Sequence, residues 1–324
     1  MIKKSGKLKM LVAALGMVSI MGAGVTYAAD KYPDKPITII VPYGPGGTTD
    51  IVGRAIAESI SKQLGQPVII ENKPGAAGSM GVIDMLSAKP DGYRLTLTPV
   101  GIFRQPYLQK TRYDPIRDIT YIASFLTYDF AVTVGPDSPF KTVEDLVVAA
   151  KANPGEITYS TPGQYTGNQV VLAALGLAED VEFSHIPYKG DAGAIAALLG
   201  GHTDVAVVTN SVLPHLQSGR VRVLATADAE RNNEFGDIPT LKELGYEVIV
   251  PSPLGLGGPA GLPQEIVDTL DNAIKKSFED DNVKNIVKNL GVRTYYLNSK
   301  DYSDFAKKNF ESEKNIVNNL GLDK

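Results

Sequence analysis

The sequence predicts an α/β protein with two domains, and three observations lead to that prediction. Apolar runs rich in β-branched residues alternate with segments whose apolar residues recur at helical spacing, as expected for mainly parallel sheets flanked by helices. Loops rich in Gly and Pro separate these segments. The chain of 324 residues is long enough for about two ordinary domains, each with its own core.

The composition excludes several kinds of protein. The chain has no Cys, so it can form no disulfide, no thiolate metal site and no cysteine nucleophile. Its 32 Lys and Arg against 36 Asp and Glu give a formal net charge of −4. A nucleic-acid binder would instead carry a basic face. We therefore expect no nucleic-acid partner.

Residues 1–28 have the pattern of a secretory signal peptide. Lysines and no acids precede an apolar run from Met10 to Ala23, and small residues follow. The alternative, a transmembrane anchor, needs about 20 apolar residues, more than this run contains. We expect cleavage after Ala28, which would take the net charge from −4 to −8 because four lysines and no acid are lost. The mature protein would then reside in a Gram-negative periplasm.

The first domain is expected to begin with a strand, a loop and a helix. Residues 37–41 predict a buried strand, and the apolar residues between Ile51 and Leu64 lie on one helical face. Further strands are expected at 68–71 and 94–98, with a helix at 80–88 between them.

The second domain is expected to continue the alternation. The expected strands are 130–134, 157–160, 181–186, 204–208 and 221–225, and the expected helices are 143–152, 169–177, 192–199 and 213–217.

The chain is then expected to return to the first domain. Segment 251–259 is rich in Gly and Pro and predicts a linker, which two amphipathic helices, 263–280 and 301–319, follow. Crossings near 129–135 and 250–258 predict a two-strand hinge. The expected lobes are 29–129 with 253–324 (lobe I) and 130–252 (lobe II).

The loop VPYGPGGTTD at 41–50 joins a predicted strand to a predicted helix. Free backbone amides at a helix start, together with the helix dipole, favour an anion. The loop lacks the third glycine of a dinucleotide fingerprint and the Lys of a P-loop, so a carboxylate is the better candidate. A purely structural turn remains the alternative. We expect Asp50 to cap the helix rather than to act as a base.

Further loops should face the same cleft, because open α/β sheets bind ligands at the carboxyl ends of their strands. These loops are 72–79, 161–168 and 187–193. Arg104 follows the strand 94–98 and has two interpretations: it holds a second ligand carboxylate, or it forms a surface ion pair. The three histidines have no short metal spacing, and no G-x-S-x-G elbow is present. We expect no catalytic residue, metal or cofactor.

Six ordered motifs resemble one family over the chain from about Tyr32 onward. The motifs are YPDKPI at 32–37, VPYGPGGTTD at 41–50, ENKPG at 71–75, PDGY at 90–93, IPYKG at 186–190 and IPTLKELG at 238–245. They resemble the Bug family, the extracytoplasmic solute receptors of tripartite tricarboxylate transporters.

The resemblance implies a two-lobed periplasmic binding protein of type II, the Venus-flytrap kind, which holds an organic carboxylate in the cleft. It implies delivery to one large and one small membrane subunit, and we expect a monomeric receptor that is not an enzyme. Reporting to a membrane kinase is an alternative, and catalysis on a carboxylate is another. With Arg104, the expected ligand-binding residues are Tyr43, Gly44, Gly46, Gly47, Thr48, Ser160, Thr161, Thr166, Gly167, Gly190 and Asp191.

Two positions depart from the family pattern. Tyr43 stands where Phe is frequent, and Asp191 stands where a neutral residue is expected. An acid facing the pocket would disfavour a tricarboxylate, so the identity of the ligand stays open.

Overall fold

The computed structural model describes residues 32–320, which belong to one compact unit. The expected signal peptide and its cleavage site lie outside the described residues. Within 32–320, no helix is both long enough and apolar enough to span a bilayer.

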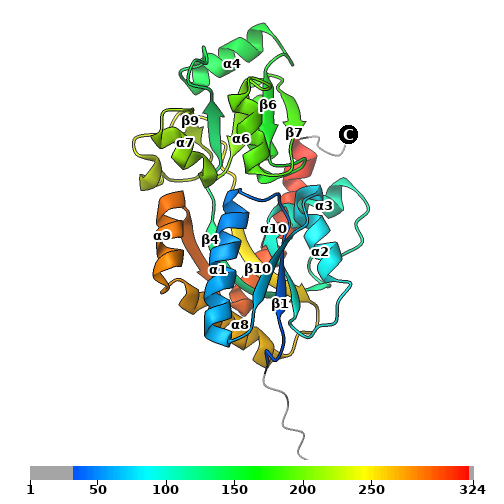
Figure 1. The fold of residues 1–324 in the computed structure, drawn as a ribbon. Coiled ribbons are helices and arrows are strands. Elements are labelled where there is room, and N and C mark those ends of the chain that lie inside the picture. The colour runs from blue at the N-terminus through cyan, green and yellow to red at the C-terminus, as the bar shows by residue number, and fades with distance from the viewer. Residues whose placement is uncertain (1–31, 321–324) are drawn as a thin grey trace, which may run out of the picture. The chain divides into compact units, whose positions relative to one another are not determined.

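The first lobe is built on a six-stranded sheet with the strand order β11-β4-β10-β3-β1-β2 (Figure 1). Its strands are β1 (Ile37–Val41), β2 (Val68–Asn72), β3 (Arg94–Pro99), β4 (Ile119–Thr127), β10 (Pro253–Pro259) and β11 (Arg293–Leu297). Its helices are α1 (Thr48–Leu64), α2 (Ser79–Met85), α3 (Gly101–Leu108), α8 (Gln264–Ser277), α9 (Asp281–Leu290) and α10 (Ser299–Leu320).

Helices cover both faces of this sheet. Apolar residues of α1, α8 and α9 pack on one face, and those of α2, α3 and α10 pack on the other. Both faces are therefore covered, which explains why four of the five residues of β1 are apolar.

The second lobe is built on a five-stranded sheet with the strand order β7-β6-β8-β5-β9. Its strands are β5 (Ala131–Val134), β6 (Thr158–Thr161), β7 (Ser184–Pro187), β8 (Val205–Val208) and β9 (Arg222–Thr226). Its helices are α4 (Val143–Ala152), α5 (Gly167–Glu179), α6 (Asp191–Leu199) and α7 (Leu213–Gln217). Short 3₁₀ turns lie at Ala76–Gly78 in the first lobe, and at Asn210–Val212 and Asn233–Phe235 after β8 and β9.

The α/β class and the two-lobed fold are confirmed, but the sheets are mixed rather than mainly parallel. In the first sheet β1 pairs in parallel with β2 and β3, whereas β10 runs antiparallel to β3 and β4. In the second, β5 runs antiparallel to β8 and β9. The antiparallel strands β4, β5 and β10 adjoin the two crossings between the sheets. The expected lobe boundaries at 129/130 and 252/253 stay a prediction.

The linker expected at 251–259 was wrong. Residues 253–259 form β10, a fully buried strand between β3 and β4. Its glycines allow large neighbours to approach the backbone: a Cβ on Gly255 would lie 2.3 Å from the Tyr302 ring, and one on Gly258 would lie 2.5 Å from Leu262. The Gly and Pro content of the segment suggested a loop, but the glycines are there because large side chains pack directly against the backbone of this strand. The expected helix at 80–88 ends at Met85, and α3, β4, α9 and β11 were not expected.

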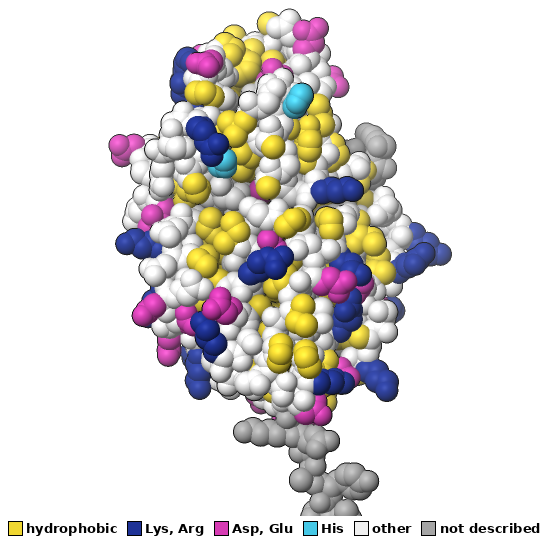
Figure 2. Space-filling view, in the orientation of Figure 1, with side chains coloured by type: hydrophobic (Ala, Val, Ile, Leu, Met, Phe, Trp, Pro, Cys, Tyr) yellow, Lys and Arg dark blue, Asp and Glu magenta, His cyan; other side chains and the backbone are white. Residues whose placement is uncertain are grey.

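The last helix links the two lobes. Tyr302 and Ala306 in the first half of α10 pack in the first lobe, whereas Ile316 and Leu320 pack against the core of the second. Figure 1 shows α10, in red, extending toward β7. On the face drawn in Figure 2, basic and acidic side chains are interspersed.

Candidate functional site

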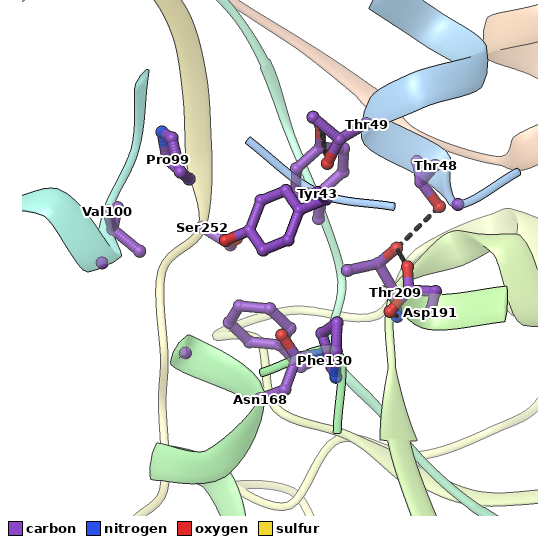
Figure 3. Close-up of a pocket in the computed structure, with 15 residues that line it drawn as sticks. Tyr43, Thr48, Thr49, Pro99, Val100, Phe130, Asn168, Asp191, Thr209 and Ser252 are labelled. Atoms are coloured by element: carbon purple, nitrogen blue, oxygen red, sulfur yellow. Dashed lines mark hydrogen bonds between the residues drawn. The ribbon is translucent and has the colours of Figure 1, made fainter. Parts of the chain in front are cut away.

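A pocket lies where loops from the two sheets meet (Figure 3). It is lined by Tyr43, Gly47, Thr48, Thr49, Pro99, Val100, Gly101, Tyr128, Phe130, Pro162, Gly167, Asn168, Asp191, Thr209 and Ser252. Its cavity of about 30 Å³ has room for about one or two water molecules. Two hollows of about 520 and 620 Å³ lie elsewhere, and their linings include none of the twelve expected binding residues.

Tyr43 lies in the centre of the pocket. In Figure 3, Thr48, Thr209 and Asp191 lie on one side of it, and Pro99 and Val100 lie on the other. Burial raises the pKa of the Tyr43 phenol far above its usual value, so the side chain is a neutral hydroxyl. The side of the pocket with Thr48, Thr209 and Asp191 is polar, and the side with Pro99 and Val100 is apolar.

The amides of the first loop have protein partners in this conformation. Gly44 N donates to Lys189 O at 2.7 Å, across the lobes. Gly46 N donates to Asp50 Oδ2 at 2.9 Å. Asp50 lies in the first turn of α1, where an acid suits the helix dipole, but the expected cap was wrong because the N-cap residue is Gly47 and no side chain caps the helix. Neither glycine lines the pocket, whereas Gly47 and Thr48 do.

Hydroxyl groups join the two lobes beside the pocket. The Thr48 and Thr209 hydroxyls are hydrogen-bonded at 2.6 Å, and Ser211 N donates to Thr48 Oγ1 at 2.7 Å. Thr48 begins α1 in the first lobe, and Thr209 follows β8 in the second. These hydrogen bonds connect the two lobes directly beside the pocket.

Three of the hydroxyls expected in the second lobe are used inside that lobe. Ser160 Oγ donates to Ala194 O at 3.0 Å, and Thr161 and Thr166 Oγ1 each donate to Gly163 O at 2.9 Å. None of the three lines the pocket. Ser160 thus connects β6 to α6. Thr161 and Thr166 shape the loop before α5, and the first residues of that helix, Gly167 and Asn168, do line the pocket.

Gly190 precedes α6 and does not line the pocket, whereas Asp191, the first residue of α6, does. Gly190 has φ 132°, and a Cβ there would lie 3.1 Å from Gly44 N, so glycine allows the first loop to approach. Asp191 is 5% exposed. Burial raises its pKa, although hydrogen bonds from Thr209 and Ser211 act in the opposite direction.

Arg104 is neither at the surface nor in the pocket lining. It is fully buried on α3, and its Nε and Nη2 donate to the Glu313 carboxylate at 2.7 and 2.9 Å. Its Nη1 donates to Tyr165 O at 2.9 Å, in the second lobe. The ion pair expected at the surface is thus a buried pair between α3 and α10. Its guanidinium also holds the loop before α5.

Five of the twelve expected residues come together in the pocket: Tyr43, Gly47, Thr48, Gly167 and Asp191. The pocket also contains residues that sequence reasoning did not select. Asn168 belonged to a loop already expected at the cleft, and Tyr128, Phe130 and Ser252 lie at or next to the two crossings. Aromatic residues at a predicted hinge were the signal that could have found Tyr128 and Phe130.

The comparisons with known proteins agree with one another. Residues 52–322 match the family described as "Tripartite tricarboxylate transporter family receptor". The Cupriavidus necator "UPF0065 protein in gbd 5'region" is 40% identical over 312 residues, covering 96% of this chain and 94% of that protein.

Two solved structures resemble the described fold. The periplasmic binding protein BugD is 28% identical with a TM-score of 0.85, over 90% of this chain and 99% of BugD. MatC from Rhodopseudomonas palustris, solved with bound malate, is 25% identical with a TM-score of 0.82, over 88% of this chain and all of MatC. On the extent of these matches, the chain belongs to the tripartite tricarboxylate transporter receptor family, the group of solute-binding proteins that its motifs resemble.

Proposed function

We propose that this chain is a periplasmic receptor that captures an organic carboxylate between its lobes and delivers it to the membrane subunits of a tripartite tricarboxylate transporter. The observation that carries the proposal is the meeting of three helix N-termini at one pocket. Helices α1, α5 and α6 begin at Thr48, Gly167 and Asp191, and all three residues line it.

None of these helices has a side-chain N-cap hydrogen bond. The positive ends of helix dipoles favour an anion, and free first-turn amides can donate to it. Asp191 already places a negative charge at the start of α6. Its carboxylate also lies beside Thr48 at the start of α1, because the Thr209 hydroxyl is hydrogen-bonded to both residues. The start of α5 is therefore the position for a ligand carboxylate, and the neutral side chains of Asn168, Thr49 and Ser252 line the same pocket. The malate bound to MatC is likewise an organic carboxylate.

A thermal-shift screen followed by calorimetry tests this proposal. Mono-, di- and tricarboxylates are titrated into the mature protein, and at least one carboxylate should raise the melting temperature, because a ligand that binds only the folded state stabilises it. Turnover of the bound compound would favour an enzyme instead.

Gly167→Ala tests where binding takes place. An added Cβ would lie 2.4 Å from Phe130 Cζ, so the ring should tilt into the pocket and weaken binding at least tenfold. Gly135→Ala is the control, because a Cβ there meets nothing within 4 Å. Equal affinities in the two variants would contradict binding in this pocket.

A further inference from the structure

Asp191 sets the charge of the pocket. Among the described residues that line it, Asp191 is the one carboxylate, and no Lys, Arg or His lines it. A receptor for a dicarboxylate or tricarboxylate gains from a cation that faces the second negative group. This pocket presents an acid instead.

The partners of Asp191 are neutral. Its oxygens accept from Thr209 N at 3.3 Å, from Ser211 Oγ at 3.2 Å and from the Thr209 hydroxyl. These donors hold the carboxylate in place but leave its charge without an opposite charge. A buried carboxylate in that situation is attracted to a cation and repels a second anion more strongly than an exposed one does.

Asp191 lies at a different end of the pocket from the start of α5. Asp191 lies with Thr48 and Thr209 on one side of Tyr43, whereas Asn168, at the start of α5, lies toward Phe130 (Figure 3). A ligand carboxylate at the start of α5 would therefore leave the other end of the same ligand to face Asp191.

We propose that Asp191 is a specificity-determining residue, and that the receptor selects carboxylates that also carry a positively charged nitrogen, such as amino acids, over di- and tricarboxylates that lack one. This inference rests on the proposed function, because it requires that a carboxylate binds in the pocket. It sets this chain apart from MatC, whose bound malate has no cationic group.

Matched ligand pairs test the inference with the unmodified protein. Calorimetry compares propionate with β-alanine, succinate with aspartate, and glutarate with glutamate, because each pair differs by one ammonium group. In the best-binding pair, the ammonium-bearing member should bind about 10- to 100-fold more tightly, which is the scale of one charged hydrogen bond. Tighter binding of the member without the ammonium group would overturn the inference.

The variant Asp191→Asn removes the charge and keeps the size of the side chain. The preference within the pair should fall at least tenfold, chiefly because the ammonium-bearing ligand loses affinity. Asp129→Asn is the control: Asp129 is also a buried carboxylate that accepts from Asn210 and Asn232, but it lies outside the pocket lining and is paired with Arg293 at 3.2 Å. It should leave the preference unchanged.

The outcomes separate the two claims. If both members of every pair bind the wild type equally, or if Asp191→Asn weakens both equally, the inference is overturned while the receptor function stands. If no carboxylate in the screen binds, the proposed function fails and the inference fails with it.

Discussion

His185 connects the stability of the second lobe to pH. It lies on β7, at the edge of the second sheet, and its Nε2 is 2.7 Å from Thr161 Oγ1. Burial lowers the pKa of His185 from 6.5 to about 4. The unfolded chain therefore takes up a proton between these two values while the folded chain does not, so the free energy of unfolding falls as pH falls from 6.5 to 4.

Replacing His185 with Gln removes this proton uptake. Between pH 6.5 and 4 the wild type should lose about 1–3 kcal/mol more stability than the variant, because each pKa unit corresponds to about 1.4 kcal/mol and the ring is partly exposed. Urea unfolding of both proteins at several pH values measures the difference. Parallel pH profiles would show that His185 contributes nothing to acid sensitivity.

Arg104 shows what a single sequence can reveal about a residue and what it cannot. Its place after β3 predicted that it faces the cleft, whereas it is buried outside the pocket lining, and an ion pair was one of the two expected roles. Its partner Glu313 lies 209 residues away on a helix that crosses to the second lobe. No local pattern predicts that contact. Burial raises the pKa of Glu313, but the adjacent guanidinium opposes that rise and favours a charged pair.

The glycines of the binding loops could be selected from sequence, but their roles could not. A strand, a glycine-rich loop and a helix start indicate an anion site. Whether an amide is free depends on neighbours in space, and Gly44 N is taken by Lys189 O of the other lobe. Gly47 and Gly167 line the pocket because they begin or precede helices directed at it.

At the scale of elements, β10 is the strand on which the first lobe depends. It is buried along its whole length, and Gly255 lies against both the Tyr302 ring and the backbone of β4. Gly255→Ala should lower the free energy of unfolding by at least about 2 kcal/mol, because the added Cβ would lie 2.4 Å from Ala123 O, a backbone atom that cannot easily shift.

Denaturant unfolding measures this change, again with Gly135→Ala as the control. The control should change stability by no more than about 0.5 kcal/mol, since open space surrounds that position. A Gly255→Ala variant as stable as the control would mean that β10 does not need its glycines, and that the segment is held more loosely than described.

Elements with a clear apolar period were predictable from sequence, and those defined by tertiary packing were not. The strand at 37–41 and the helices at 143–152 and 213–217 have the expected bounds. Strand β10 was missed because its glycines suggest a turn until Tyr302 and Leu262 are placed beside them.

In the molecule as a whole, the chain crosses from one lobe to the other twice, and the helix α10 contacts both lobes. The chain passes between the sheets near residues 129 and 252, and α10 packs against both cores. The alternation of strands and helices predicted the two sheets but not their mixed order, because strand pairing is decided by contacts between distant segments. The amphipathic pattern of α10 likewise does not predict that its second half packs against the second lobe.

We propose that the two lobes close over a carboxylate. The described contacts between Gly44 and Lys189, Thr48 and Thr209, and Arg104 and Tyr165 belong to a closed arrangement, and a cavity of about 30 Å³ is too small for a ligand of several carbons to enter without the lobes separating. Small-angle X-ray scattering, recorded with and without a carboxylate whose binding calorimetry has confirmed, tests this claim most directly. Closure of the lobes should decrease the radius of gyration when the carboxylate saturates the protein, and an unchanged radius of gyration at saturation would rule closure out.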